Sequence, residues 1–203
     1  MRVGLFGGTF DPPHNGHLLA ASDAFEALGL DRLVWIPAAQ QPLKIGVQSA
    51  TADDRLAMVR LATAGDSRFA VDPIEIERAG LSFTVDTLEA LAREHPGDRL
   101  VLLVGADVVT TFGKWRSPRR IAELAQLAIM HRAVEGGTVE KAAVAGAIRA
   151  VTGGDLPAPV VLETRRVDIS STEIRERVLA GRSLHGFVPD AVARYISEHA
   201  LYR

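Results

Sequence analysis

The chain has 203 residues, of which 47% are hydrophobic and 24% are charged, and it contains no cysteine. This composition excludes an intrinsically disordered chain, and the absence of cysteine excludes disulfides, thiolate catalysis and cysteine-ligated metal sites. The 23 Lys and Arg residues nearly balance the 25 Asp and Glu residues, for a net charge of −2, so no overall basic field is available to hold nucleic acid. No apolar stretch approaches the ~20 residues of a membrane span, and the N-terminal apolar run is too short for a secretion signal. We therefore expect a soluble cytoplasmic protein that binds neither nucleic acid nor membrane.

Short apolar runs alternate with amphipathic stretches along the whole chain. The pattern predicts strands over residues 3–6, 33–36, 69–76, 100–104, 127–130 and 160–162. It predicts helices over residues 16–28, 53–64, 85–95, 118–124, 139–151, 172–180 and 190–199. Strands that alternate with helices indicate an α/β fold with a doubly wound parallel sheet. Glycines stand where several of these helices are expected to end in a left-handed cap or a chain stop: Gly29, Gly65, Gly97 and Gly181.

Two stretches lack clear periodicity. Residues 152–159 carry Gly and Pro, but too little chain follows them for a second core, so we interpret them as a loop. Residues 1–203 are accordingly expected to form a single domain, with a small C-terminal helical portion from about residue 170. Residues 38–52 are predicted to form a long loop, and long loops in compact domains are commonly binding elements.

The segment after the first predicted strand reads GGTFDPPHNGH, from Gly7 to His17. In an open parallel sheet, the first turn from strand to helix is a common phosphate site. The two glycines allow the backbone to approach a ligand closely, and the two prolines stiffen the turn. His14 and His17 lie on one face if the helix has begun by residue 15. Two imidazoles beside free N–H groups at a helix start predict a polyphosphate site in an exposed turn.

Other interpretations of this segment remain open on the residues alone. Pairs of histidines three residues apart also occur in ordinary capping turns. A structural zinc ion would need a third ligand, for which Asp11 is the near candidate. The segment matches neither the dinucleotide-binding glycine motif nor the P-loop.

A second motif, DISSTEIRER, runs from Asp168 to Arg177. Ser170 and Glu173 fit a capping box, which predicts a helix that begins near Ser171. Arg175 lies on the same helix face as Thr172 and adds a forked cationic donor to the hydroxyls and the helix dipole. The alternative is an ordinary capped helix with a solvated arginine. Two anion sites, each at a helix start, suit a triphosphate bound along its length.

Together the two motifs resemble the HxGH and ISSTxxR signatures of the nucleotidyltransferase α/β-phosphodiesterase superfamily. Within it, the chain is most similar to the bacterial nicotinate-nucleotide adenylyltransferase family, from residue 1 to roughly residue 196. The resemblance implies a Rossmann-like nucleotidyltransferase domain and an enzyme of NAD biosynthesis. The implied reaction transfers the adenylyl group of ATP to nicotinate mononucleotide, giving nicotinic acid adenine dinucleotide and pyrophosphate. Mg²⁺ would be carried by the ATP phosphates, with no metal site made of protein ligands.

The resemblance also assigns roles to residues at the ATP. His14 and His17 would donate hydrogen bonds around the reacting phosphorus, and Arg175 would act with them in catalysis, because Ser171, Thr172 and Arg175 would hold the departing phosphates. The full set of implied ATP-binding residues is Gly7, Gly8, Thr9, Phe10, His14, His17, Gly105, Asp107, Ile169, Ser170, Ser171, Thr172 and Arg175.

The middle of the chain resembles the part of the family that binds the acceptor. Residues 78–88, RAGLSFTVDTL, are similar to the family's RxGPSYTxDTL, whose Thr holds the nicotinate carboxylate largely through backbone amides. Gly105, Asp107 and Trp115 resemble a GxD…W stretch in which the Asp contacts a ribose and the Trp stacks on the pyridine ring. The implied acceptor-binding residues are Lys44, Ser82, Phe83, Thr84, Trp115 and Arg132. The chain departs from the family pattern at Leu43, Leu81 and Phe83, where His, Pro and Tyr are usual.

Each of these residues also has a plainer interpretation. Trp115 could fill the core, Asp107 could cap a helix, and Arg132 could be a solvated surface residue. At the level of function, one alternative is a sister adenylyltransferase that uses nicotinamide mononucleotide or phosphopantetheine. The others are a non-catalytic nucleotide-binding module and a structural α/β domain. The oligomeric state, including a homo-oligomer, is left open by the sequence.

Overall fold

The structure is a computed structural model that describes residues 1–42, 50–132, 141–165 and 167–203. The chain forms two compact units. The first comprises Met1–Phe6, Ser22–Leu33 and Phe83–Arg166, and the second comprises Gly7–Ala21, Val34–Ser82 and Val167–Arg203. Three elements contribute residues to both units: β1 (Arg2–Gly8), α1 (Asn15–Leu28) and β2 (Arg32–Pro37). The single domain over residues 1–203 stays a prediction.

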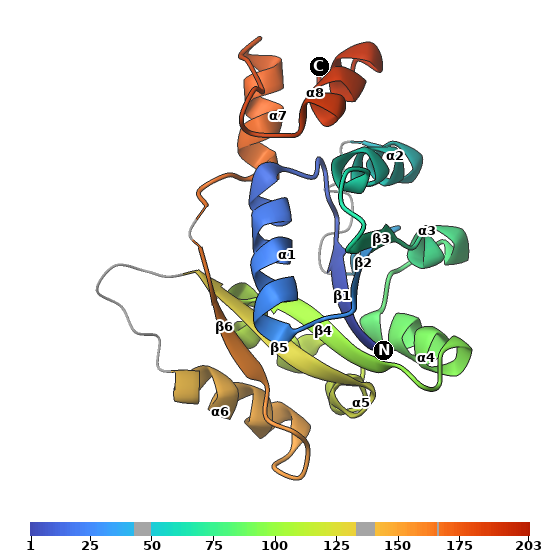
Figure 1. The fold of residues 1–203 in the computed structure, drawn as a ribbon, viewed down its shortest axis with the longest axis vertical. Coiled ribbons are helices and arrows are strands. Elements are labelled where there is room, and N and C mark those ends of the chain that lie inside the picture. Colours follow the sequence, from blue (N-terminus) through green and yellow to red (C-terminus); the bar gives the residue numbers. More distant parts are fainter. Residues whose placement is uncertain (43–49, 133–140, 166) are drawn as a thin grey trace. The chain divides into compact units, whose positions relative to one another are not determined.

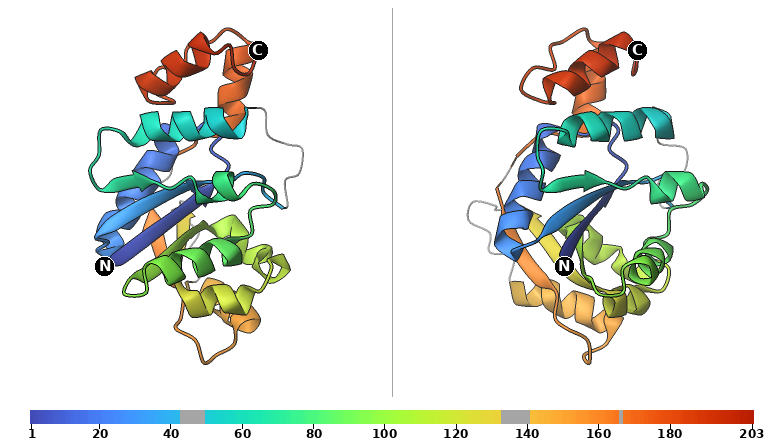
Figure 2. Two further views of the ribbon diagram at one scale, coloured as in Figure 1. Left: turned by 90° about the vertical axis from the view of Figure 1, so that its right-hand side faces the viewer. Right: turned by 45° about the vertical axis from the view of Figure 1, so that its right-hand side comes forward.

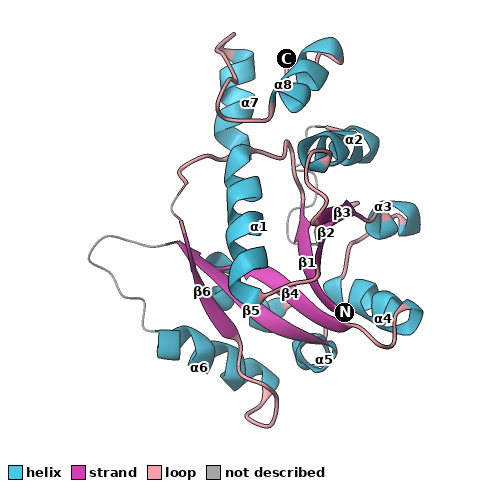
Figure 3. Cartoon of the chain, viewed as in Figure 1, coloured by secondary structure: helices cyan, strands magenta, loops and turns pink. Residues whose placement is uncertain are grey.

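Six strands form one sheet in the order β3-β2-β1-β4-β5-β6. The remaining strands are β3 (Phe69–Val71), β4 (Arg99–Gly105), β5 (Ala125–Arg132) and β6 (Val160–Thr164). β1 pairs in parallel with β4, β4 with β5, and β5 with β6 (Figure 3). The predicted α/β fold with a parallel sheet is confirmed.

In the first unit, β4 is the most deeply buried strand. Its residues 100–104 are all buried, as a strand covered on both faces requires. Three helices pack in a row, with α4 (Thr84–Glu94) against α5 (Pro118–Leu124), and α5 against α6 (Lys141–Thr152) (Figure 2). Two short 3₁₀ helices that the sequence pattern did not predict follow β4: η1 (Ala106–Thr110) and η2 (Phe112–Lys114).

The second unit holds the start of α1 together with α2 (Ala52–Thr63), α3 (Ile74–Arg78), α7 (Ser171–Leu179) and α8 (Asp190–Glu198). Its core is an apolar cluster drawn from α2, α7, α8 and the loops beside them: Ala50, Met58, Ile174, Val188, Val192 and Ile196. Figure 1 shows the first turn of α7 directly above the first turn of α1.

Most predicted elements lie within two residues of their observed bounds, but the strand predicted over residues 69–76 is wrong at its C-terminal end. The strand ends at Val71, because Pro73 cannot donate a ladder hydrogen bond. The amide of Ile74 donates to the Asp72 carboxylate over 2.9 Å, which starts α3 instead. Gly29 and Gly181 adopt left-handed conformations, as expected of helix ends. Over the described ranges, no helix combines the length and apolar character needed to cross a membrane.

Candidate active site

The turn between β1 and α1 belongs to the second unit and is largely buried. Phe10, Asp11 and His14 are only 3%, 4% and 6% exposed. The Phe10 ring packs 5.1 Å from the Trp35 ring and edge-on to His17, at 5.2 Å between centroids. Gly8 is needed beneath it, because a Cβ there would stand 2.8 Å from the Phe10 ring. The expectation of an exposed turn is therefore wrong: the aromatic packing covers most of it, and His17 is half-buried.

His14 and His17 form a stacked pair at the start of α1. Their ring centroids are 3.6 Å apart and their planes differ by 26°. The backbone amide of His14 donates to Nδ1 of His17 over 3.2 Å, and the amide of His17 donates to Nδ1 of His14 over 3.3 Å. An Nδ1 that accepts a hydrogen bond carries no proton, so each neutral ring carries its proton on Nε2. The pair can therefore offer two N–H donors to one ligand.

The start of α7 is built as the capping pattern predicts. The Ser170 hydroxyl accepts a 3.1 Å hydrogen bond from the amide of Glu173, and the helix begins at Ser171. The amides of Ser171 and Thr172, in the first turn, have no acceptor within the helix. These N–H groups and the positive end of the helix dipole suit an anion.

Hydrogen bonds join the two motifs directly. The Ser171 hydroxyl donates to the Pro12 carbonyl over 2.9 Å. The Arg175 guanidinium donates to the Asp11 carbonyl over 2.8 Å and to the Thr172 hydroxyl over 3.3 Å. The two helix starts therefore converge on one place in the second unit, as a shared triphosphate site requires. Because the Ser171 hydroxyl proton is used by Pro12, its amide is the donor left for a phosphate.

Neighbouring residues help to fix the geometry of the two helix starts. The backbone amide of Asn15 donates to the Phe187 carbonyl over 2.9 Å, and its side-chain amide donates to the Gly186 carbonyl over 2.9 Å. A Cβ on Gly16 would stand 3.0 Å from Nδ1 of His14, so glycine there gives the ring its space. Ile169 packs against the apolar cluster of the second unit and anchors the entry to α7.

The residues predicted to bind the acceptor lie mainly in the first unit. Thr84 is the first residue of α4, and the amides of Asp86 and Thr87 donate to the Phe83 carbonyl over 3.1 and 3.3 Å. The amides of Thr84 and Val85 are thus the first-turn donors left for an external anion. The Arg116 guanidinium lies 4.9 Å above the Phe83 ring.

Two alternatives for the first unit are wrong. Asp107 lies inside η1 and does not cap it, because the N-cap is Gly105. Trp115 is half-buried at the end of η2 and does not fill the core; Phe112, 5.5 Å away between ring centroids, is the fully buried ring. Neither observation tests the proposed contacts with ribose and pyridine.

Of the three remaining residues predicted to bind the acceptor, only Ser82 has a side chain that the structure describes. Ser82 is buried in the second unit, where its hydroxyl accepts from the amide of Ala39 over 2.9 Å. Its own amide donates to the Gln40 carbonyl over 2.8 Å, so Ser82 orders the segment after β2. Arg132 ends β5, and its side chain lies outside the described part of the structure. Lys44 lies outside the described residues altogether.

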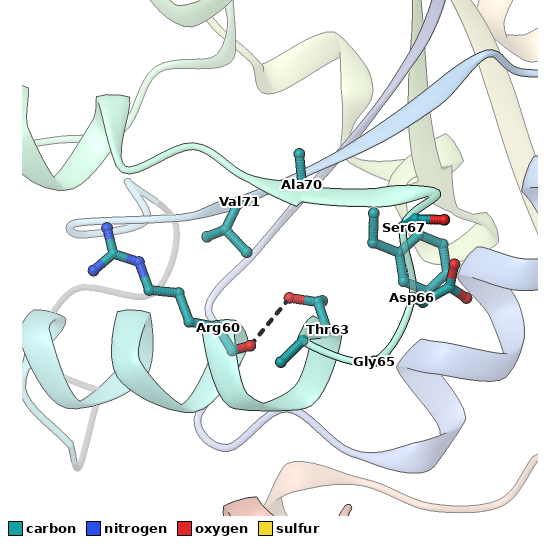
Figure 4. Close-up of a pocket in the computed structure, with 9 residues that line it drawn as sticks. Arg60, Thr63, Gly65, Asp66, Ser67, Ala70 and Val71 are labelled. Atoms are coloured by element: carbon teal, nitrogen blue, oxygen red, sulfur yellow. Dashed lines mark hydrogen bonds between the residues drawn. The ribbon is translucent and has the colours of Figure 1, made fainter.

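A surface hollow between the end of α2 and β3 contains none of the predicted site residues. It is lined by residues that include Arg60, Thr63, Asp66 and Val71 (Figure 4). The Thr63 hydroxyl donates to the Val59 carbonyl over 3.0 Å and to the Arg60 carbonyl over 3.4 Å.

Sequence reasoning missed two side chains that contact the turn. Arg55 on α2 donates to the Thr9 carbonyl over 2.8 Å and to the Ala39 carbonyl over 3.0 Å. The hydroxyl of Tyr202, the penultimate residue, donates to the Asp11 carboxylate over 2.8 Å. The spacing of Arg55 relative to buried Met58 and Val59 could have indicated that it faces inward, whereas no local pattern marks Tyr202.

Comparison with known proteins matches the chain to the cytidylyltransferase-like family model over residues 5–177. The probable nicotinate-nucleotide adenylyltransferase of Gemmatimonas aurantiaca is 53% identical over 100% of this chain and 93% of the relative. That of Thermus thermophilus is 45% identical over 100% of both chains. A structure of Plasmodium falciparum nicotinic acid mononucleotide adenylyltransferase complexed with NaAD has a TM-score of 0.78, at 14% identity, over 99% of this chain and 97% of that one. The chain belongs to the cytidylyltransferase-like family and, within it, to the nicotinate-nucleotide adenylyltransferases.

Proposed function

We propose that this chain transfers the adenylyl group of ATP to nicotinate mononucleotide and releases pyrophosphate and nicotinic acid adenine dinucleotide. Its family membership supports the reaction class and the acceptor. The observation that carries the proposal is the direct bonding of the two motifs, Ser171 to Pro12 and Arg175 to Asp11. These bonds support a single site that contains two stacked imidazoles, a guanidinium and a helix N-terminus.

The chemistry needs positioning and charge stabilisation. The 5′-phosphate oxygen of nicotinate mononucleotide forms a bond to the α-phosphorus of ATP, while the bond from that phosphorus to the β-bridging oxygen breaks. A phosphate monoester is already a nucleophile near neutral pH, so no general base is required. The protein has to align the two phosphates and neutralise the charge of the departing pyrophosphate.

Different residues of the second unit bind the different phosphates of ATP in this proposal. His14 and His17 donate hydrogen bonds from their Nε2–H groups to oxygens around the α-phosphorus. The free amides at the start of α7 and the Arg175 guanidinium hold the β- and γ-phosphates. All of these groups are donors fixed before the ligand arrives, so little reorganisation is needed as charge develops.

The donor set of this site fits a magnesium ion carried by the nucleotide. Nitrogen donors surround the proposed phosphates, whereas the nearby Asp11 carboxylate accepts hydrogen bonds from Tyr202 and from the amide of Ala50. Among the residues that the structure describes, no group of three His, Asp or Glu side chains is placed to hold a metal. Mg²⁺ bound to ATP would supply charge neutralisation on the triphosphate.

For the acceptor, the free amides of Thr84 and Val85 support recognition of a carboxylate at the start of α4. Trp115, which is half-buried, offers a ring face for the pyridine. These two contacts would favour nicotinate over its uncharged amide. Lys44 and Arg132 keep their proposed contacts with the acceptor.

Pyrophosphate release from Mg-ATP tests the function. Nicotinate mononucleotide, nicotinamide mononucleotide and phosphopantetheine are offered separately as acceptors. We expect the highest kcat/KM with nicotinate mononucleotide. A higher value with either other acceptor would assign the chain to a sister activity, and release with none of them, despite ATP binding, would indicate a non-catalytic module.

A further inference from the structure

Arg55 is an arginine in the interior of the second unit. It is 1% exposed, although it lies on a helix whose other charged residues are mostly at the surface. Its two terminal nitrogens donate to the carbonyls of Thr9 and Ala39. One guanidinium therefore joins the chain after β1 to the chain after β2.

Burying the charged guanidinium of Arg55 costs desolvation free energy. Burial lowers the pKa of Arg55, and the nearby Asp11 carboxylate partly offsets this by raising it. The Nε atom is buried without a hydrogen-bond partner among the described residues. An apolar side chain would fill the space without the desolvation cost, so stability alone does not account for an arginine here.

Tyr202 approaches the same turn from the C-terminal end of the chain. Its hydroxyl and the amide of Ala50 both donate to Oδ1 of Asp11, over 2.8 and 3.2 Å. Arg175 binds the carbonyl of the same aspartate. Burial, reinforced by the Asp11 charge, raises the pKa of Tyr202, so the phenol keeps its proton and remains a donor at all working pH values.

We propose that Arg55 and Tyr202 are positioning residues, which hold the turn before α1 in the conformation that binds ATP. The C-terminal segment that carries Tyr202 thereby contributes to ATP binding. The inference rests on the proposed function. Arg55 holds the turn at Thr9 and Tyr202 holds it at Asp11, on the two sides of Phe10, whose ring packs against His17. Neither side chain needs to touch the substrate: together they keep Gly8–His17 in the shape that directs the histidine donors.

Tyr202→Phe tests this with a matched control in the same unit. The Tyr195 hydroxyl donates to the Asp54 carboxylate over 2.9 Å, so Tyr195→Phe deletes an equivalent phenol-to-carboxylate hydrogen bond away from the turn. Binding of a non-hydrolysable ATP analogue is measured by calorimetry in the full chain, with urea unfolding alongside. We expect Tyr202→Phe to weaken analogue binding by about fivefold to tenfold, the size of one hydrogen bond. Tyr195→Phe should change binding by less than about twofold at a similar loss of stability.

Arg55→Lys gives a second, independent variant. A lysine keeps the charge but lacks the planar fork that reaches two carbonyls at once. Its control is Arg60→Lys on the same helix, where the side chain is exposed. We expect Arg55→Lys to raise KM for ATP and lower kcat, while KM for nicotinate mononucleotide stays within about twofold, as expected of a change confined to the ATP side.

The outcomes separate this proposal from the proposed function. Equal analogue affinity in Tyr202→Phe and Tyr195→Phe, or a parental KM for ATP in Arg55→Lys, would overturn the positioning role even if the parent enzyme is fully active. Weakened analogue binding in Tyr202→Phe, combined with a parent chain that releases no pyrophosphate, would instead retain the positioning role and overturn the function.

Discussion

At the scale of single residues, the histidine pair carries the most specific chemistry. Nδ1 of each ring accepts a hydrogen bond from the backbone amide of the other histidine. The positions of both Nε2 donors therefore follow from the backbone at the start of α1. The sequence motif predicted that both rings share a face. It could not predict the packing around them, because the Phe10 ring contacts His17 and is itself packed on Trp35, which comes from a separate strand.

His17→Ala should reduce kcat by about 10²–10³-fold, because a fixed donor to developing charge is lost. The loss of its contact with the Phe10 ring should cost only about 1 kcal/mol of unfolding free energy. Steady-state kinetics and urea unfolding measure the two effects. His199→Ala, which removes a histidine stacked on Tyr195 at 4.0 Å, is the control and should leave kcat unchanged. Turnover at the parental rate in His17→Ala would remove His17 from the mechanism.

Gly16→Ala should lower activity through crowding of His14. The added Cβ would stand 3.0 Å from Nδ1 of the ring, which must shift by a few tenths of an ångström. Gly146→Ala on α6 is the matched control, since nothing lies within 4 Å of a Cβ there. The control should gain about 0.5–1 kcal/mol of stability, as alanine replaces glycine in a helix, with unchanged activity. An active Gly16→Ala enzyme would show that the ring tolerates displacement.

At the scale of elements, the proposed phosphate site at the start of α7 depends on local capping by Ser170. Ser170→Ala should cost about 1 kcal/mol of stability, and it should also raise KM for ATP because the free amides beside it lose their fixed direction. Thr51 caps α2 in the same way, accepting from the amide of Asp54 over 3.1 Å. Thr51→Ala should therefore match the stability loss without the change in KM, and a raised KM in both variants would point to a general loosening of the unit.

The ion pair between Asp23 on α1 and Arg165 after β6 predicts a pH dependence of the stability. Hydrogen bonds from Arg165 lower the pKa of Asp23, while burial partly opposes them. A carboxyl whose pKa is lower in the folded state stabilises the fold above its unfolded pKa and loses that contribution as the pH falls through the folded value.

Asp23→Asn should therefore be less stable than the parent at pH 7, and the difference should shrink as the pH falls below the usual carboxyl range. Urea unfolding at pH 7, 5 and 3 measures it. The variant Arg165→Met removes the partner and should reproduce the same trend. A constant difference across this range would mean that the pair does not set the pKa of Asp23.

Several elements were predictable because their causes are local. The unbroken apolar run of β4 indicates a buried parallel strand, and the serine cap of α7 sets its first residue. The helices η1 and η2 were not predictable, because their 3₁₀ geometry after β4 has no periodic signal. The start of α3 depends on the Asp72 side chain, which competes with the strand ladder for the backbone.

At the scale of the whole molecule, the second unit is assembled from segments far apart in the sequence. Tyr202 and Asp11 are separated by 191 residues, and Arg175 and the Asp11 carbonyl by 164. The motifs predicted that the starts of α1 and α7 meet, because two anion sites at helix starts suit one triphosphate bound along its length. The contacts of Arg55 and Tyr202 with the turn were missed, because helical spacing indicates only that Arg55 faces inward and no local pattern marks Tyr202.

The central claim is that the starts of α1 and α7 bind one triphosphate together. A crystal structure with a non-hydrolysable ATP analogue and nicotinate mononucleotide tests it most directly. We predict phosphate oxygens within hydrogen-bond distance of Nε2 of His14 and His17 and, in the same molecule of analogue, of the Thr172 amide and the Arg175 guanidinium. A triphosphate bound at only one of the two helix starts, in crystals of the active enzyme, would contradict the account.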